Sequence, residues 1–376
     1  MAGGKMGQHV PSIRIQPYTE DWTAAVKDFN TRVLTTGLDD DLRFPERHIP
    51  WYPKRDGAPI FQEFYLAVED SAMRGGFCLT FEPWKLDDGE ISVSHYRLPI
   101  SEGIRDKAYK HVSGELMRGA LERQPHLYCL GMGGFDRPVT KSLKKMGWSL
   151  AAVPFLFKVN HPQRFLRESP VLRKTPSRKL LVDFAAYTGT GWLAIKTLQA
   201  VRSARRLGRG AGEIVPEFGP WADELWQQAG SSYRFLARRD RASLNLRYSP
   251  TQDRFIRFKV GASGWALLLD TPMRNNKYFG NLRVGSIVDV MARPEDASEV
   301  AVAATRELER RGVDLLVTNQ ANEAWVNAFR RCGFLEGPSN YVYAVSPPLA
   351  QRLGDVEGAR GTFHLTRGDG PGPTRL

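Results

Sequence analysis

The sequence predicts an α+β protein built from two similar domains in tandem. A chain of 376 residues is long enough for two domains of about 100–200 residues each. Within each half, antiparallel strand-like runs follow one another through hairpin turns between the first and the later helices, which is an α+β order and not a βαβ alternation. Gly147-Trp148 and Gly333-Phe334 occupy the same place in the two halves. We expect a first domain, a basic linker with a helix, a second domain and a flexible tail, over residues 12–160, 161–211, 212–348 and 349–376.

In the first half, alternation predicts a strand over residues 13–17, and apolar residues at helical spacing predict a helix over 20–33. An irregular insert rich in Asp, Pro and Arg follows over 35–62. Clusters of Gly and Asp then separate three strand-like runs, which is typical of hairpins, at 64–69, 76–82 and 91–98. The remaining elements of this half are predicted as helix, strand, helix and strand, over 104–121, 126–132, 137–146 and 151–159.

The second half repeats this order after a linker in which a helix is expected over 179–207. A strand over 213–218 precedes helices over 221–228 and 233–248. A hairpin joins strands over 255–260 and 265–269, and a buried strand follows over 287–291. The last elements are predicted as helix, strand, helix and strand, over 297–311, 314–318, 322–331 and 341–345, with Gly333 ending the second of these helices.

Composition and charge narrow the functional classes. The net charge of +12 favours an anionic partner, which could be nucleic acid, a membrane surface or a phosphorylated small molecule, and arginines are densest over 202–209. Nothing resembles a compact nucleic-acid-binding module. Cys78, Cys129 and Cys332 are too far apart for a disulfide framework, so we expect buried, reduced thiols. No histidine pair has metal-ligand spacing, and neither a signal peptide nor an apolar run of about 20 residues is present. We therefore expect a cytoplasmic protein without a metal.

Two short elements carry a resemblance to a known family. The last third of the second half contains a strand, an asparagine and a helix ending in glycine and an aromatic residue, through Asn319, Asn322, Ala324, Ala328, Phe329, Arg331, Gly333 and Phe334. This pattern resembles the end of an N-acetyltransferase of the GNAT superfamily, and residues 141–148 resemble a weaker copy of it. Residues 240–250 contain an L-N-x-R-Y element, which resembles double-domain GNAT-like proteins associated with bacterial polysaccharide biosynthesis.

The resemblance implies acetyl-CoA or another acyl-CoA as cosubstrate. In that fold the central strand splays from its neighbour, and the pantetheine arm lies in the gap like an added strand. The pyrophosphate then meets the N-terminus of the following helix. The loop before this helix contains one glycine in the first half and none in the second. The second-half loop instead carries Glu295 and Asp296. These acids would repel a phosphate, or they stabilise the start of the helix through its dipole. The candidate cofactor-binding residues are Ile100, Ser101, Gly103, Arg105, Val290, Met291, Arg293, Asn319 and Asn322.

Acyl transfer to an amine needs a base, oxyanion donors and an acid. Asp289 lies in an apolar strand, where burial would raise the pKa of its carboxyl toward a useful value, so it is the leading candidate base. The alternative is a structural Asp paired with an arginine such as Arg247 or Arg283. In the first half Glu90 and His95 are weaker candidates. The tyrosine that often serves as the acid in this family is replaced by Phe329 and Leu143.

The sequence leaves three functions open. The leading hypothesis is an acyl-CoA-dependent N-acyltransferase that acts on an amino sugar or a related small cell-envelope precursor. The second is a catalytically silent scaffold whose basic surface docks a biosynthetic enzyme or an anionic membrane. The third is a peptidoglycan-type aminoacyl transferase using charged tRNA, in which the helix expected over 179–207 would serve as the arm.

Overall fold

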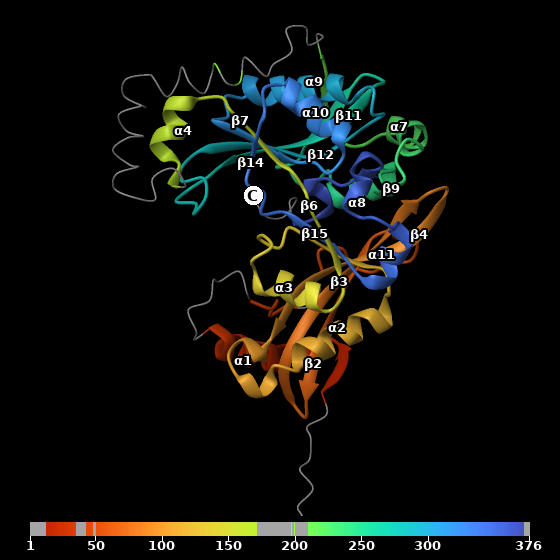
Figure 1. Ribbon diagram of the computed structural model, residues 1–376, viewed down its shortest axis with the longest axis vertical. Helices are drawn as coiled ribbons and strands as arrows, with labels where there is room; N and C mark the ends of the chain where they lie inside the picture. The colour runs from red at the N-terminus through yellow and green to blue at the C-terminus, as the bar shows by residue number, and fades with distance from the viewer. Residues whose placement is uncertain are drawn as a thin grey trace, which may run out of the picture. The chain divides into compact units, whose positions relative to one another are not determined.

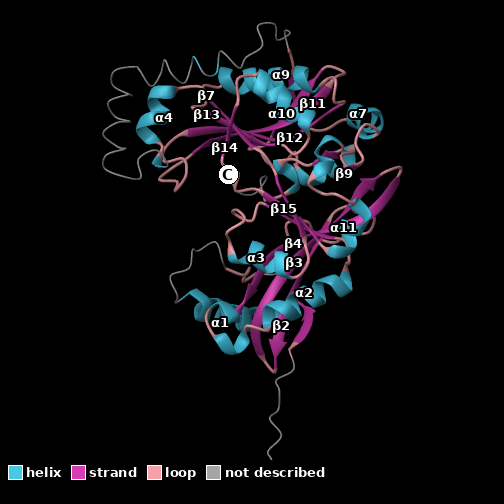
Figure 2. Ribbon diagram, in the orientation of Figure 1, coloured by secondary structure: helices cyan, strands magenta, loops and turns pink. Residues whose placement is uncertain are grey.

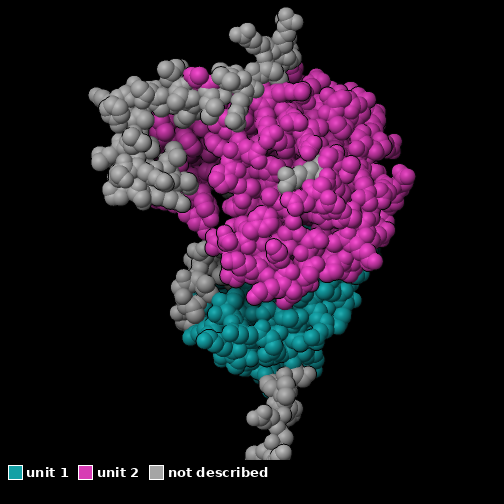
Figure 3. Space-filling model, viewed as in Figure 1, with its two compact units in different colours: residues 1–82, 92–128 teal, residues 83–91, 129–376 magenta. Residues whose placement is uncertain are grey.

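The computed structural model describes residues 13–34, 43–47, 50–170, 197, 199 and 210–371. These residues form two compact units (Figure 3). Unit 1 comprises residues 1–82 and 92–128, and unit 2 comprises residues 83–91 and 129–376. The tip of the hairpin between the third and fourth strands therefore belongs to unit 2.

Unit 1 is a sheet with helices, and its elements follow the predicted order (Figure 1). Val26, Phe29 and Val33 recur at helical spacing and pack on the sheet residues Phe64 and Cys78. Strands β1 and β2 pair antiparallel, β2 and β3 likewise, and β4 pairs with β5 in parallel. Its elements are β1 (Arg14–Pro17), η1 (Glu20–Trp22), α1 (Thr23–Leu34), β2 (Phe61–Glu69), β3 (Ala72–Leu86), β4 (Gly89–Ser101), η3 (Glu102–Ile104), η4 (Lys107–Tyr109), α2 (Val112–Arg123) and β5 (Leu127–Leu130).

Unit 2 is centred on a seven-stranded sheet in the order β14-β7-β13-β12-β11-β10-β8, and Figure 2 labels β14, β7, β13, β12 and β11 of it. The strands are β7 (Phe155–Val159), β8 (Glu213–Val215), β10 (Ile256–Val260), β11 (Gly264–Pro272), β12 (Arg283–Ala292), β13 (Leu315–Asn319) and β14 (Leu335–Gly337). Alternate residues of β11 face opposite sides. Ala266 and Leu268 pack with α9 (Ala297–Arg310) and α10 (Glu323–Arg331), whereas Trp265 and Leu267 pack with α7 (Trp221–Gly230) and α8 (Arg241–Arg247). The sheet is thus covered on both faces.

The rest of unit 2 consists of short elements. They are α3 (Pro138–Lys145), β6 (Ser149–Ala152), α4 (Pro162–Glu168), β9 (Phe235–Ala237), β15 (Val342–Val345), α11 (Pro347–Leu353), η6 (Gly358–Gly361), β16 (Phe363–His364) and η7 (Arg367–Asp369). Gly147 and Gly333 end α3 and α10 with φ of 83° and 85°, which confirms their predicted role as helix terminators.

Several predicted elements differ from the structure. The helix predicted over 104–121 begins only at Val112, after two 3₁₀ turns, the second capped by Asp106. The helix predicted over 233–248 is instead strand β9 followed by α8, because the Asp240 carboxylate accepts the Ser243 N–H and starts a new helix there. Almost all of the helix predicted over 179–207 lies outside the described residues.

The strand predicted over 151–159 is broken at Pro154, which has no N–H to donate and restricts the residue before it. The two pieces then part. β6 pairs antiparallel with β15, whereas β7 inserts between β13 and β14 in the seven-stranded sheet. Strand β7, assigned by sequence to the first half, thereby completes the sheet of the second half.

The tail also differs from expectation. The sequence predicts a flexible tail over residues 349–376, but residues 347–371 contain α11, η6, β16 and η7. The side chains of His364, Thr366 and Asp369 are buried. None of the described helices has the length and hydrophobicity of a transmembrane segment.

Candidate functional site

The pairing between the central strands of the second half stops well before β12 ends. β12 pairs with β13 in parallel from Val284–Leu315 to Ile287–Thr318, after which β12 continues to Ala292 while β13 ends at Asn319. On its other side β12 pairs with β11 through a bulge at Val288. The bulge turns Val288 and Asp289 to the same face, where Val288 packs with Trp265 and Asp289 meets Tyr248.

The gap beside β12 is filled by residues 361–370, which we call the C-terminal segment. Asn322 donates its side-chain amide to the carbonyls of Gly361 and Phe363 at 3.0 and 3.1 Å. The Ala321 N–H donates to the Leu365 carbonyl at 2.9 Å, and Gln320 and Thr366 form an antiparallel bridge. On the β12 side His364 Nε2 lies 2.8 Å from the Val290 carbonyl. The C-terminal segment therefore bonds to a backbone carbonyl of β12 and to residues 320–322, which follow β13.

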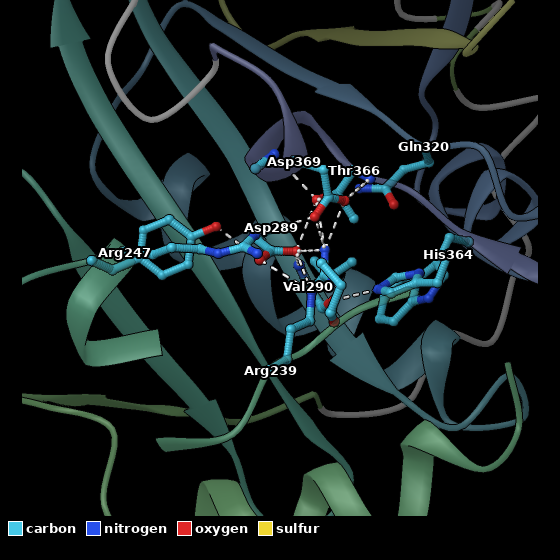
Figure 4. Close-up of polar contacts among 12 residues, drawn as sticks. Arg239, Arg247, Asp289, Val290, Gln320, His364, Thr366 and Asp369 are labelled. Carbon is cyan, nitrogen blue, oxygen red and sulfur yellow. Dashed lines mark hydrogen bonds and ion pairs between the residues drawn. The ribbon is translucent and has the colours of Figure 1, made fainter. Parts of the chain in front are cut away.

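A buried charge cluster holds the C-terminal segment in this gap (Figure 4). Arg239 is 0% exposed and lies between two carboxylates, Asp289 at 3.0 Å and Asp369 at 2.8 Å. Arg247 reaches Asp369 at 3.2 Å. The hydroxyls of Tyr248 and Thr366 each donate to Asp289 at 2.8 Å. Two cations thus balance two anions, so that each buried charge has an opposite partner.

The charges of the cluster set the pKa values of its members. Although burial disfavours the charged form of Arg239, the Asp289 and Asp369 carboxylates raise its pKa above the ordinary value. Burial likewise raises the pKa of Asp369, but Arg239 and Arg247 outweigh it and the net pKa is lowered. Burial and the charge of Asp289 raise the pKa of Tyr248 well above its usual range. All three groups therefore keep their ordinary protonation states at neutral pH.

His364 is a neutral structural histidine. Burial and the charge of Arg239 lower its pKa to about 4. Because its Nε2 faces a carbonyl oxygen, Nε2 must carry the proton and Nδ1 is the bare nitrogen. Its ring stacks on Tyr233 with centroids 4.6 Å apart. A protonated His364 would have to place a second charge beside Arg239.

The L-N-x-R-Y element supplies one side of this cluster. Asp240 caps α8, and Asn245 exchanges two hydrogen bonds with the backbone of Phe218 at 2.8 and 3.0 Å. Arg247 and Tyr248, at the end of the element, contact Asp369 and Asp289. Its polar residues therefore position α8 and bind the filled gap.

The second-half residues predicted to bind a cofactor are gathered around the C-terminal segment. Val290 and Asn322 bond to it directly, and Asn319 accepts a hydrogen bond from Arg367 at 3.3 Å. Met291 is part of the apolar core. Arg293 pairs with Asp296 at 2.8 Å, so the acids of this loop bind Arg293 instead of capping α9 through side-chain hydrogen bonds.

Asp289, the predicted base, lies in the charge cluster and is 0% exposed. Its partner is Arg239, whereas sequence reasoning named Arg247 or Arg283 as alternatives. Arg283 pairs instead with Asp270 at 2.7 Å, and Arg247 with Asp369. The geometry of Asp289 is that of a structural ion pair, and its role as a base stays a prediction.

In the first half, the predicted loop between β4 and α2 is partly buried and partly exposed. Ile100 packs in the core and Ser101 is buried, whereas Arg105 is exposed. Gly103 is needed where it stands, because an added Cβ would lie 2.6 Å from the Tyr109 carbonyl oxygen. The neighbouring Glu102 carboxylate is buried between Arg32 at 2.9 Å and Arg74 at 3.0 Å.

The two first-half candidates for catalysis are not brought together. Glu90 is exposed and pairs with Arg238 at 3.4 Å. His95 is buried and stacks on Tyr128 with centroids 4.7 Å apart. The predicted acid positions, Leu143 and Phe329, are both buried. Among the described residues no cluster of His, Cys, Asp or Glu could hold a metal ion.

Sequence reasoning missed Arg239, Thr366 and Asp369. Thr366 and Asp369 form a capping box at the start of η7. The Asp369 carboxylate accepts the Thr366 N–H, and the Thr366 hydroxyl accepts the Gly368 N–H. The spacing Thr-x-x-Asp was a usable signal, but it lies in a run rich in Gly and Pro that favoured a flexible tail.

Comparisons with known proteins show the fold. No protein-family model and no curated protein sequence matches the chain. Among solved structures it resembles Saccharomyces cerevisiae N-myristoyltransferase with bound myristoyl-CoA, with a TM-score of 0.52 and 8% identity, covering 92% of this chain and 85% of that one. It also resembles a GCN5-related N-acetyltransferase from Anabaena variabilis, with a TM-score of 0.50 and 10% identity, covering 89% and 72%. The chain therefore has an α+β fold of two tandem GNAT-like domains, each with a mixed sheet flanked by helices.

Proposed function

We propose that this protein is an acyl-CoA-dependent N-acyltransferase whose first half alone takes the acyl-CoA. The observation that carries the assignment to the first half is the filled gap of the second half. Where the fold would lay a pantetheine arm, His364 occupies the Val290 carbonyl and Gly368 lies against Asp289. The second half has no room for the same arm while the C-terminal segment is in place.

The charge distribution supports the same assignment. Arg105, Lys107 and Lys110 are exposed in the first-half loop that leads into α2, where Asp106 is the exposed acid. In the second half the corresponding loop has Arg293, already paired with Asp296. Cations near a helix start favour a pyrophosphate, so the first-half loop is the better phosphate site.

Stoichiometry and charge reversal test this proposal. Titration calorimetry of the full chain with acetyl-CoA should give one site per chain. Lys107→Glu combined with Lys110→Glu should weaken binding at least about tenfold, because two cations become anions beside the phosphates. Arg293→Glu is the matched control in the second half and should bind like the wild type. Two sites per chain, or a loss confined to Arg293→Glu, would contradict the assignment.

The acceptor in this proposal is an amino sugar or a related small cell-envelope precursor. Its support is the L-N-x-R-Y element, and the family pattern it resembles. Release of CoA from acetyl-CoA in the presence of glucosamine, followed by mass analysis of the sugar, tests it. N-Acetylglucosamine offers no free amine and serves as the control acceptor.

A catalytically silent scaffold is the second candidate. The filled gap and the apolar residues at both acid positions favour it, because neither Leu143 nor Phe329 can protonate a leaving thiolate. The scaffold would bind a biosynthetic enzyme or an anionic membrane through its basic surface. It predicts no acyl-CoA binding by calorimetry together with co-purification of a stable partner, whereas the transferase predicts the opposite pair of results.

A further inference from the structure

A buried row of polar side chains crosses the sheet of unit 1. On β2 and β3, Gln62 and Thr80 are cross-strand partners, and the Gln62 amide donates to the Thr80 hydroxyl at 3.0 Å. Glu82 lies two residues further along β3 and therefore faces the same side. Its carboxylate accepts a hydrogen bond from the Tyr128 hydroxyl of β5 at 2.5 Å.

Both members of this pair are buried. Glu82 is 5% exposed and Tyr128 is 1% exposed. On the opposite face of the same strands, Phe61 and Phe81 stack with centroids 4.8 Å apart. An apolar pair would pack in the place of Glu82 and Tyr128 without the cost of burying a carboxylate, so the pair needs a reason beyond packing.

Glu82 and Tyr128 lie where the pairing between the central strands of unit 1, β4 and β5, ends. Tyr128 is the cross-strand partner of His95 on β4, and the two rings stack. Three residues beyond His95, Leu98 has a φ of 52°, which a branched side chain adopts only under constraint. In the second half the strands part at the equivalent place, and Asp289 lies two residues beyond the last pair. The reacting end of an arm laid beside β4 would therefore reach the His95–Tyr128 level.

We propose that Tyr128 and Glu82 form the proton relay of the acyl transfer, an inference that rests on the proposed function. The acceptor amine attacks the thioester carbonyl carbon and forms the C–N bond. The amine proton passes to the Tyr128 oxygen as the Tyr128 proton passes to Glu82. The C–S bond then breaks, its electron pair leaves as the thiolate of CoA, and the proton held by Glu82 is returned to the thiolate through the same hydroxyl or through water.

His95 is a positioning residue in this scheme. Its ring lies nearly parallel to that of Tyr128, at an interplanar angle of 11°, and fixes the direction in which the phenol points. Glu82 is the group that takes up the proton during the reaction. Tyr128 is the catalytic residue, since its oxygen would meet the amine.

Two isosteric variants test the relay. Glu82→Gln keeps an oxygen that accepts the Tyr128 hydrogen bond but cannot take up the proton, and Tyr128→Phe removes the hydroxyl. Each should lower kcat for CoA release from acetyl-CoA by about 100-fold or more. The double variant should be no slower than either single one, because both remove the same relay. Glu82→Gln should also remove the acidic limb of the kcat–pH profile, a change that a purely structural role would not produce.

Unit 1 contains a matched control pair. The Tyr65 hydroxyl donates to Glu63 at 2.6 Å on β2, outside the buried row. Glu63→Gln and Tyr65→Phe should keep the wild-type kcat and pH profile. Melting curves and acetyl-CoA titrations of all variants separate unfolding and lost binding from lost chemistry.

The outcomes are distinguishable. If the wild type binds no acetyl-CoA, the proposed function fails, and the relay fails with it. If the wild type binds acetyl-CoA but transfers the acyl group neither to glucosamine nor to water, the relay is wrong although the cofactor assignment stands. If the wild type is active and folded Glu82→Gln keeps its rate and its acidic limb, the relay alone is refuted.

Discussion

Replacing Asp289 by asparagine distinguishes a structural carboxylate from a catalytic one. The change leaves the shape of the side chain but removes one of the two anions that balance Arg239 and Arg247. The buried cluster then carries a net positive charge, and the amide offers one acceptor oxygen where the carboxylate offered two to Arg239 and Tyr248. Removing one partner of a buried ion pair destabilises a protein by about 3–5 kcal/mol.

The assay is thermal unfolding with a matched control. At roughly 2–4 °C per kcal/mol for a unit of this size, Asp289→Asn should lower the melting temperature by about 6–20 °C. Asp270→Asn makes the same chemical change in the Asp270–Arg283 pair, in which the Arg283 side chain is 45% exposed. A pair of that kind contributes about 0–1 kcal/mol, so Asp270→Asn should melt within about 4 °C of the wild type.

Hydrogen exchange locates the effect. Because Arg239 ties Asp289 to Asp369, amides of the C-terminal segment should exchange faster in Asp289→Asn than in the wild type. If Asp289→Asn instead melts with the wild type, keeps its exchange pattern and loses acyl transfer, the ion-pair interpretation is refuted and Asp289 acts in the chemistry.

Other buried groups give three further predictions. The pKa of His364 is about 4 in the folded chain against 6.5 when unfolded. The unfolded state therefore binds the extra proton first, and about 3 kcal/mol of stability present above pH 6.5 is lost as the pH falls toward 4. His364→Gln should flatten that pH dependence in denaturant titrations. Gly368→Ala should lower the melting temperature, because its Cβ would clash with the Tyr248 oxygen, whereas Gly114→Ala, with open space around it in a helix, should raise it. Burial raises the pKa of Cys78 to about 12 and of Cys332 to about 11, so both thiols should react with a thiol reagent only after unfolding, and fast labelling of the native chain would contradict this.

The elements that sequence predicted well are those defined by local physics. The amphipathic spacing of Val26, Phe29 and Val33 requires only one helix and one apolar surface, and the helix forms as expected. The same holds for α10, which Asn322 starts and Gly333 ends. The order of strands and helices, and the likeness of the two halves, could be predicted because they also depend on local sequence patterns.

The sequence did not predict which strands pair with one another. Nothing in the local pattern of residues 149–159 says that β6 pairs with β15 while β7 pairs with β13. Strand pairing is decided by which distant backbone groups remain to be satisfied, and Pro154 supplies only the break between the two pieces. Sequence periodicity reports which face of a strand is buried, and the neighbour that buries it lies elsewhere in the chain.

The candidate site also combines features that local sequence predicts with features that depend on distant parts of the chain. The sequence predicted that Asp289 is a polar residue in an apolar strand, and the resemblance to GNAT proteins implied that the central strands separate near it. What lies in that gap depends on the folded chain, because Arg239 and Asp369 are 50 and 80 residues from Asp289 on either side of it in the chain. Each of the three charges lacks a partner until folding brings them together. A buried charge is stable only beside its opposite, so the Gly- and Pro-rich end of the chain is ordered by an arginine that no local pattern connects to it.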